Sequence, residues 1–235
     1  SAMIFLFFGQ GLANVAFPIF VELWTKKETK KFQEGMRLLH KYTLVILSPV
    51  ILTFFVFADV FIVQFFGQDY AAAIMPFQIL LIGVLLFTEA QINHNIIAAI
   101  GKPKTITKII FGAAALNAAL NFILIPYYGI DGAAIATLVS YAMAFFVSSY
   151  LLARYTETKM PWLTWVKMTL VLLIFVGSAF YLRQLFMFNL LLVILLVVFI
   201  SSFLYGFTAW LFGLADFQEI KYYIRLVLKR KSSNP

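Results

Sequence analysis

The sequence predicts an all-α integral membrane protein with about seven transmembrane helices. Hydrophobic residues make up 63% of the 235 residues and charged residues only 12%, whereas soluble proteins carry about 25% charged residues. The apolar residues fall into runs of about 20 or more, the length that a helix needs to cross about 30 Å of hydrocarbon. The chain has no cysteine, which excludes disulfides, thiol catalysis and cysteine metal sites.

The apolar runs divide the chain into three regions. Residues 1–152 should form a bundle of five spans, and residues 153–214 should add two transmembrane helices. Residues 215–235 carry apolar side chains at helical spacing among basic ones, so this tail is either a helix on an anionic inner leaflet or a solvated basic segment. The seven expected spans are approximately residues 2–24, 42–64, 74–99, 107–126, 132–153, 166–187 and 190–213.

The basic residues indicate how the chain crosses the membrane. All but one of the 18 Lys and Arg residues fall in the segments 25–41, 100–108, 154–167 and 214–235. The positive-inside rule places these segments, and the carboxyl terminus, in the cytoplasm of a multi-pass protein of the inner (cytoplasmic) membrane. Topology therefore explains the net charge of +8, and we expect no binding to nucleic acid. The segment 25–41 also mixes charges with apolar residues and could be a short helix on the membrane surface.

The amino terminus is expected outside, because seven crossings separate it from a cytoplasmic carboxyl terminus. Ser1 leads directly into apolar sequence without the basic start of a secretory signal. We therefore expect the chain to be the second part of a longer protein, with a native seven-span protein as the alternative.

Residues 117–141 predict a tight hairpin between two spans. Pro126 should end the arriving helix, because proline has no amide hydrogen and disfavours helix in the residue before it. Gly129 and Gly132 permit the backbone angles of a tight reversal, and Asp131 can cap the helix that follows.

The first span places Gln10, Asn14 and Pro18 on one face. A proline in the middle of a span frees a carbonyl and allows a kink, which suits a helix that bends during a transport cycle. Polar residues in a bilayer commonly mark a solute path or a helix contact, and both interpretations remain open here.

The third span carries the densest polar cluster, which consists of Glu89, Gln91, Asn93, His94 and Asn95. Glu89 is the only carboxylate well inside an expected span, so it should face the bundle interior or a wet cavity. This position makes it a candidate proton or cation site. For His94, a simple hydrogen-bonded or solvated histidine is the better interpretation.

Asn117, Asn121 and Thr137 could bring three side-chain oxygens together across the hairpin. Hard cations take oxygen ligands, but three such groups also suit interhelical hydrogen bonding. Together with Gln10, Asn14, Glu89, Gln91 and Asn93, they form the expected substrate or ion path.

Several motifs resemble the carboxyl-terminal half of the polysaccharide flippases in the multidrug/oligosaccharidyl-lipid/polysaccharide exporter superfamily. The resemblance covers about residues 1–152. It rests on Pro18 before a basic loop, FFGQDY at 65–70, GKPK at 101–104, NAALNFILIP at 117–126 and YGIDGAAIATLVSY at 128–141.

The resemblance implies a fourteen-helix protein, of which this chain would supply helices 8 to 14: most of the second lobe plus two extra helices. Its partners would be the missing amino-terminal lobe, membrane lipids and a polyprenyl-linked oligosaccharide of O-antigen type, flipped from the inner to the outer leaflet by alternating access. Asn117 and Thr137 match a cation site of the peptidoglycan-precursor branch. Position 121 is Asn where that site has a carboxylate, so we assign no sodium or other cofactor.

Other functions compete with this one. A drug or cation antiporter of the same superfamily would suit Glu89. A seven-span receptor-like or retinal protein fits the span count, but a retinal protein needs a lysine midway along its last helix, and residues 190–213 contain none. A membrane glycosyltransferase would need acidic residues on a large external loop, and these connections are short. We therefore expect no enzyme activity and assign no catalytic or metal-binding residue.

Overall fold

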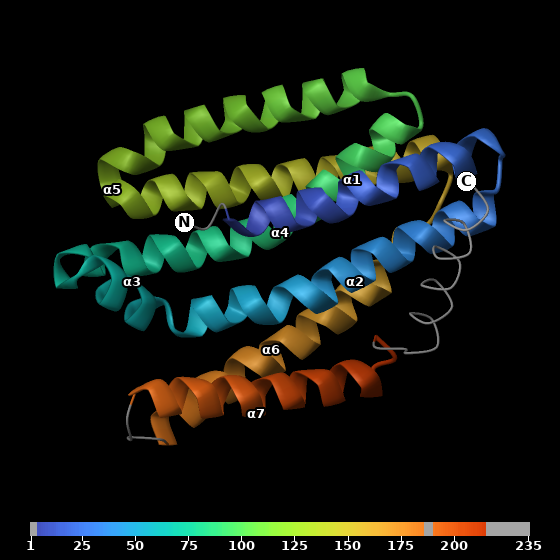
Figure 1. The fold of residues 1–235 in the computed structure, drawn as a ribbon. Helices are drawn as coiled ribbons and strands as arrows, with labels where there is room; N and C mark the ends of the chain where they lie inside the picture. Colours follow the sequence, from blue (N-terminus) through green and yellow to red (C-terminus); the bar gives the residue numbers. More distant parts are fainter. Residues whose placement is uncertain (1–3, 186–189, 215–235) are drawn as a thin grey trace, which may run out of the picture. The chain divides into compact units, whose positions relative to one another are not determined.

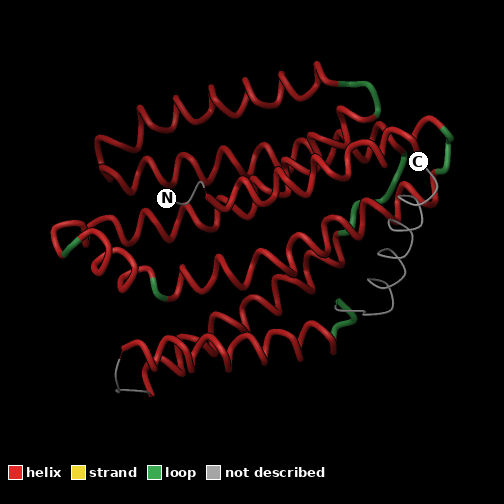
Figure 2. The backbone as a smooth tube through the Cα atoms, viewed as in Figure 1, coloured by secondary structure: helices red, strands yellow, loops and turns green. Residues whose placement is uncertain are grey.

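The described chain is almost entirely helical, as Figure 2 shows in red. The computed structural model of the protein describes residues 4–185 and 190–214, and no strand occurs among them. The basic tail expected at 215–235 lies outside the described residues. The prediction of an all-α membrane protein is confirmed, because four of the described helices are long and apolar enough to cross a membrane.

The helices fall into two compact units, Ser1–Trp162 and Leu163–Pro235. The first contains α1 to α5 and the short 3-10 helix η1, and the second is made by α6 and α7 (Figure 1). The bounds are α1 Ile4–Thr25, α2 Thr29–Val56, α3 Ala58–Phe66, η1 Gln68–Ala73, α4 Ile74–Ala99, α5 Pro103–Thr156, α6 Trp162–Leu185 and α7 Leu190–Leu211.

Helix α4 is the centre of the first unit and contacts α1, α2, α3, η1 and α5. Its bounds, Ile74–Ala99, coincide with the expected third span. On the side toward α2, Phe77, Leu81 and Val84 pack with Leu47 and Ile51 in a buried apolar cluster. A helix with neighbours on several sides is the natural place for a polar cluster, because its polar groups can find partners away from lipid.

The second span was expected at residues 42–64, and the structure differs at both ends. Helix α2 begins at Thr29, inside the basic segment, and ends at Val56, after which Ala58–Phe66 forms the separate helix α3. Phe32 and Met36 are buried, and the Phe32 ring lies 5.3 Å from that of Phe20 in α1. The segment 25–41 is therefore no separate surface helix. Its apolar residues extend the packed face of α2.

Helix α5 is a hairpin with two arms, residues 103–128 and residues 130–156. The arms lie side by side as the green and yellow-green ribbons of Figure 1. Only Gly129 leaves the helical conformation, with φ 55° and ψ −129°. Each arm is about 40 Å long at 1.5 Å per residue, enough to cross a bilayer.

The turn of this hairpin differs from the prediction in two ways. The first arm does not end at Pro126 but continues past it, and the reversal comes at Gly129. Proline removes one backbone hydrogen bond, and here that loss falls in the last turn of the arm. Asp131 forms no described cap, since its Oδ1 atom is buried without a hydrogen-bond partner in the described part of the chain.

Gly132 is required where the two arms approach each other. A Cβ atom built on Gly132 would lie 2.6 Å from the carbonyl oxygen of Leu124. At the other end of the hairpin, the Lys102 ammonium lies 3.7 Å from the centroid of the Tyr155 ring, and the hydroxyls of Tyr155 and Thr105 are 3.3 Å apart. The two arms are thus held together at both ends.

In the second unit, α6 and α7 also contact each other. The rings of Phe175 and Tyr205 meet edge to face at 6.0 Å, and Lys167 Nζ donates a hydrogen bond of 3.1 Å to the Phe212 carbonyl. The buried residues of α6 recur at helical spacing: Met168, Val171, Phe175 and Ala179. The apolar runs of this region therefore form a pair of helices in contact with each other.

Candidate functional site

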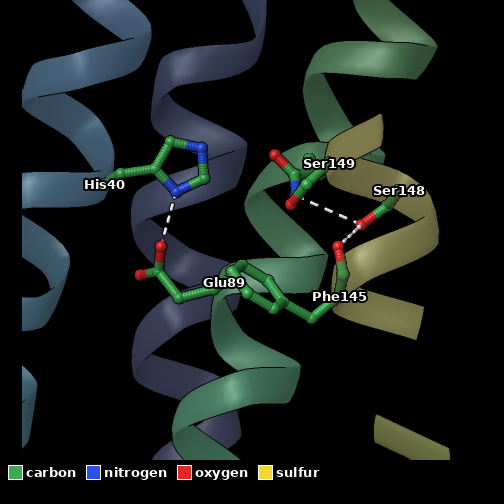
Figure 3. Close-up of polar contacts among 6 residues, drawn as sticks. His40, Glu89, Phe145, Ser148 and Ser149 are labelled. Carbon is green, nitrogen blue, oxygen red and sulfur yellow. Dashed lines mark hydrogen bonds and ion pairs between the residues drawn. The ribbon is translucent and has the colours of Figure 1, made fainter. Parts of the chain in front are cut away.

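The most unusual group of side chains lies in the interior of the first unit, where α2 and α4 meet. Nδ1 of His40 lies 2.5 Å from Oε2 of Glu89, and the two side chains are 0% and 4% exposed (Figure 3). The second carboxylate oxygen, Oε1 of Glu89, is buried and has no hydrogen-bond partner among the described residues. Glu89 therefore faces the bundle interior, as its position in an apolar span predicts.

The antiparallel course of α2 and α4 places this pair deep in the unit. His40 is eleven residues after the start of α2 and Glu89 is ten residues before the end of α4. At 1.5 Å per residue, both positions lie about 15 Å from the helix ends joined to the basic segments. Both side chains are buried in the protein interior, where an isolated charge is costly.

Sequence reasoning missed His40. It falls in the segment 25–41, which is expected to be cytoplasmic because it holds six Lys and Arg residues, and the second span is expected to begin only at residue 42. A signal was nonetheless present: Phe32, Met36 and His40 recur every four residues, which is the spacing of one helical face. The structure buries all three.

Asn93 lies one turn after Glu89 on α4 and joins that helix to the second arm of α5. Its Nδ2 donates to Oγ of Ser148 at 3.1 Å and to Oγ of Ser149 at 2.9 Å. Ser148 in turn donates to the Phe145 carbonyl at 3.0 Å (Figure 3). Because all three polar side chains are buried, this contact satisfies groups that would otherwise be costly in an apolar interior.

The rest of the polar cluster on α4 points elsewhere. Gln91 Oε1 lies 3.3 Å from Nδ1 of His94, and Asn95 Nδ2 donates to the Gln91 carbonyl at 2.9 Å. These contacts stay within one helix. The structure therefore divides the cluster into one face with Glu89 and Asn93 and another with Gln91, His94 and Asn95, and it gives His94 the simple hydrogen bond expected for it.

The three expected oxygen-bearing residues of the hairpin do come together. Asn121 Nδ2 donates to Oδ1 of Asn117 at 2.9 Å, and Asn117 Nδ2 lies 3.4 Å from Oγ1 of Thr137. Thr137 Oγ1 also donates to the Ala133 carbonyl. The chain of contacts links the two arms of α5, which is what interhelical hydrogen bonding predicts. Oδ1 of Asn121 has no described partner.

The remaining expected path residues lie in α1. Pro18 lies inside this helix and is exposed. Gln10 and Asn14 also belong to α1, but their side chains lie outside the described part of the structure. Among the described residues, no group of three or more His, Asp or Glu side chains could hold a metal ion.

Two curated proteins are similar to this chain. An uncharacterized membrane protein of Methanocaldococcus jannaschii is 30% identical over 228 residues, which cover 95% of this chain and 44% of that protein. The chain is a multi-pass membrane protein. The probable low-salt glycan biosynthesis flippase Agl15 of Haloferax volcanii is 25% identical over 164 residues, which cover 68% of this chain and 35% of that protein.

The chain spans less than half the length of these two relatives. No protein-family model matches it. The membrane prediction is thus confirmed, and one of the chain's relatives is named as a flippase.

Proposed function

We propose that this chain is part of a flippase that moves a lipid-linked oligosaccharide across the cytoplasmic membrane for polysaccharide biosynthesis. Its partners would be the lipid-linked oligosaccharide, the surrounding lipids and an amino-terminal lobe of the same protein. The single observation that carries this proposal is the similarity to a protein named as a glycan biosynthesis flippase. The motifs around the α5 hairpin support membership of the multidrug/oligosaccharidyl-lipid/polysaccharide exporter superfamily.

The interior of the first unit suits such a role. A transporter that works by alternating access needs polar groups at the depth of the bilayer midplane, on helices that contact several neighbours. Helix α4 carries Glu89 and Asn93 in the buried interior of the first unit and contacts every other helix of that unit. A polyprenyl carrier has a long apolar chain, and the described α5 surface offers exposed apolar residues such as Phe111 and Phe122 to a lipid environment.

A drug or cation antiporter of the same superfamily is the second candidate. The buried His40–Glu89 pair favours it, because an interior group that binds a proton or cation is what an antiporter requires. The two functions predict different phenotypes when the protein is expressed in a deficient strain. A flippase would restore glycan export, and an antiporter would restore resistance to a toxic compound.

Complementation separates these functions. The full-length protein is expressed in a strain that lacks its glycan flippase, with surface glycan and membrane protein level as readouts. We expect surface glycan to be restored. Well-expressed protein that restores drug resistance but leaves the glycan lipid-linked on the inner leaflet would overturn the flippase proposal.

Asn121 provides a test within the proposed function. Asn121→Leu removes the amide that donates to Asn117, and we expect both lower protein stability and lower glycan export. Asn121→Asp should introduce a dependence on cations, because a carboxylate restores a hard oxygen ligand. Full export by well-expressed Asn121→Leu would show that the amide is not needed for transport.

A further inference from the structure

His40 and Glu89 together make a group that can hold one proton. An imidazolium paired with a carboxylate, or a neutral imidazole paired with a carboxylic acid, has no net charge, and both states contain the same number of protons. Removal of that one proton leaves a carboxylate and a neutral imidazole with a net charge of −1. Because both side chains are almost fully buried, the unprotonated pair is strongly disfavoured unless water or another charge reaches it.

Two basic residues of α2, Arg37 and Lys41, lie close to His40 in sequence. Lys41 follows His40 in sequence, is 1% exposed, and its ammonium lies 5.2 Å from the centroid of the Tyr42 ring. Arg37, one turn earlier, is paired with Glu34 at 2.7 Å.

The helices of the first unit carry further titratable or charged groups, which include Arg37, Lys41 and Tyr42 on α2, His94 on α4, Tyr141 and Tyr150 on α5, Glu22 on α1 and Asp59 on α3. Glu22 is engaged with Lys26 at 2.7 Å. His94 contacts Gln91, and Tyr141 stacks on Phe87.

We propose that His40 and Glu89 form a proton-binding site that couples opening of the α2–α4 contact to proton release; its link to transport rests on the proposed function. In the arrangement seen here, the proton lies between Nδ1 of His40 and Oε2 of Glu89. When α2 and α4 separate and water enters, the N–H···O contact breaks and the proton passes to water. Uptake of a proton from water on the other side of the membrane closes the contact again.

The first test measures the proton directly and does not depend on transport. Infrared difference spectra of the full-length protein in lipid nanodiscs are recorded between about pH 5 and about pH 9, a range that includes the interval of about pH 5 to 8 in which histidine charge normally changes. We expect a carboxylic acid band that disappears in Glu89→Gln and changes frequency in Glu89→Asp. Glu34→Gln is the matched control, because Glu34 is a partly exposed carboxylate on α2, and it should leave the band unchanged.

Two outcomes of this first test would overturn the proton site. One is a carboxylic acid band of the same size in wild type and Glu89→Gln, which would assign the proton to another group. The other is the absence of any pH-dependent band in wild type and in well-folded Glu89→Asp, which would mean that the pair is a fixed structural contact.

The second test connects the site to transport. The full-length protein is reconstituted in vesicles with a fluorescent lipid-linked oligosaccharide, and flipping is followed with and without a pH gradient. The gradient should accelerate flipping by wild type and Glu34→Gln, and this acceleration should be lost in His40→Gln and Glu89→Gln. Equal acceleration in these last two variants would overturn the coupling. A wild-type protein that has the infrared band but flips nothing would refute the flippase and leave the proton site standing.

Discussion

At the scale of single residues, Asn93 is a buried amide that links two helices by hydrogen bonds. It donates to the hydroxyls of Ser148 and Ser149, which follow one another on the second arm of α5. Hydrogen bonds between transmembrane helices contribute about 0.6 kcal/mol on average and rarely more than about 1.7 kcal/mol. The contact therefore fixes the register of α4 against α5 more than it determines the stability of the protein.

A double-mutant cycle measures this contact. Asn93→Ala and Ser149→Ala, alone and together, should give a coupling free energy of about 0.6 kcal/mol in the unfolding of the protein in nanodiscs. Asn95→Ala is the control, since the hydrogen bond that the Asn95 amide donates among the described residues goes to the Gln91 carbonyl of its own helix. Coupling between Asn95 and Ser149 as large as that of Asn93 would contradict the assigned geometry.

At the scale of elements, the hairpin α5 is the part of the fold that depends most on one small residue. Its first arm is largely exposed, with Phe122 85% and Tyr127 80% accessible, so few side chains outside the hairpin hold it in place. The close approach of Gly132 to the Leu124 carbonyl therefore determines how the two arms meet.

Gly132→Ala tests that approach. Alanine favours helix over glycine by about 1 kcal/mol, but the new Cβ would collide with backbone that cannot rotate away, and overpacking costs about 1–3 kcal/mol. The collision should dominate, so we expect a lower thermal unfolding temperature. Gly112→Ala, on the same helix, meets only the flexible end of Met143 at 3.2 Å and should be neutral or slightly stabilising.

At the scale of the whole molecule, the sequence was sufficient to predict the class of protein and the bounds of α4. The bounds of α4 coincide with the prediction because a single apolar run ends at the loop around Gly101 and Lys102. The pairing of His40 with Glu89 could not be predicted, because the register of two helices 49 residues apart depends on packing that one sequence does not encode locally. The prediction of where α2 begins was wrong for a related reason. Its first residues are rich in basic side chains, and by composition such a segment resembles a loop.

The expected topology is a prediction for the whole molecule. The chain contains no cysteine, so Tyr128→Cys and Lys159→Cys can each be introduced alone at an exposed position. An impermeant thiol reagent should label position 128 from outside the cell and position 159 only after the membrane is opened. The reverse pattern would mean that every loop lies on the opposite side of the membrane from the one expected. Labelling of both positions from the same side would mean that the chain does not cross the membrane between them.

The sharp turn at Gly129 also bears on how the protein is made. With the reversal confined to a single residue outside helical geometry, the ribosome delivers two apolar arms with almost no hydrophilic linker between them. Asp131 is the one charged side chain near the turn, so only one charge must pass the bilayer, and no stretch of loop has to be exported after the first arm has settled. We therefore expect the two arms to enter the lipid together as a hairpin, and lengthening this connection should disturb insertion into the membrane before it disturbs the finished fold.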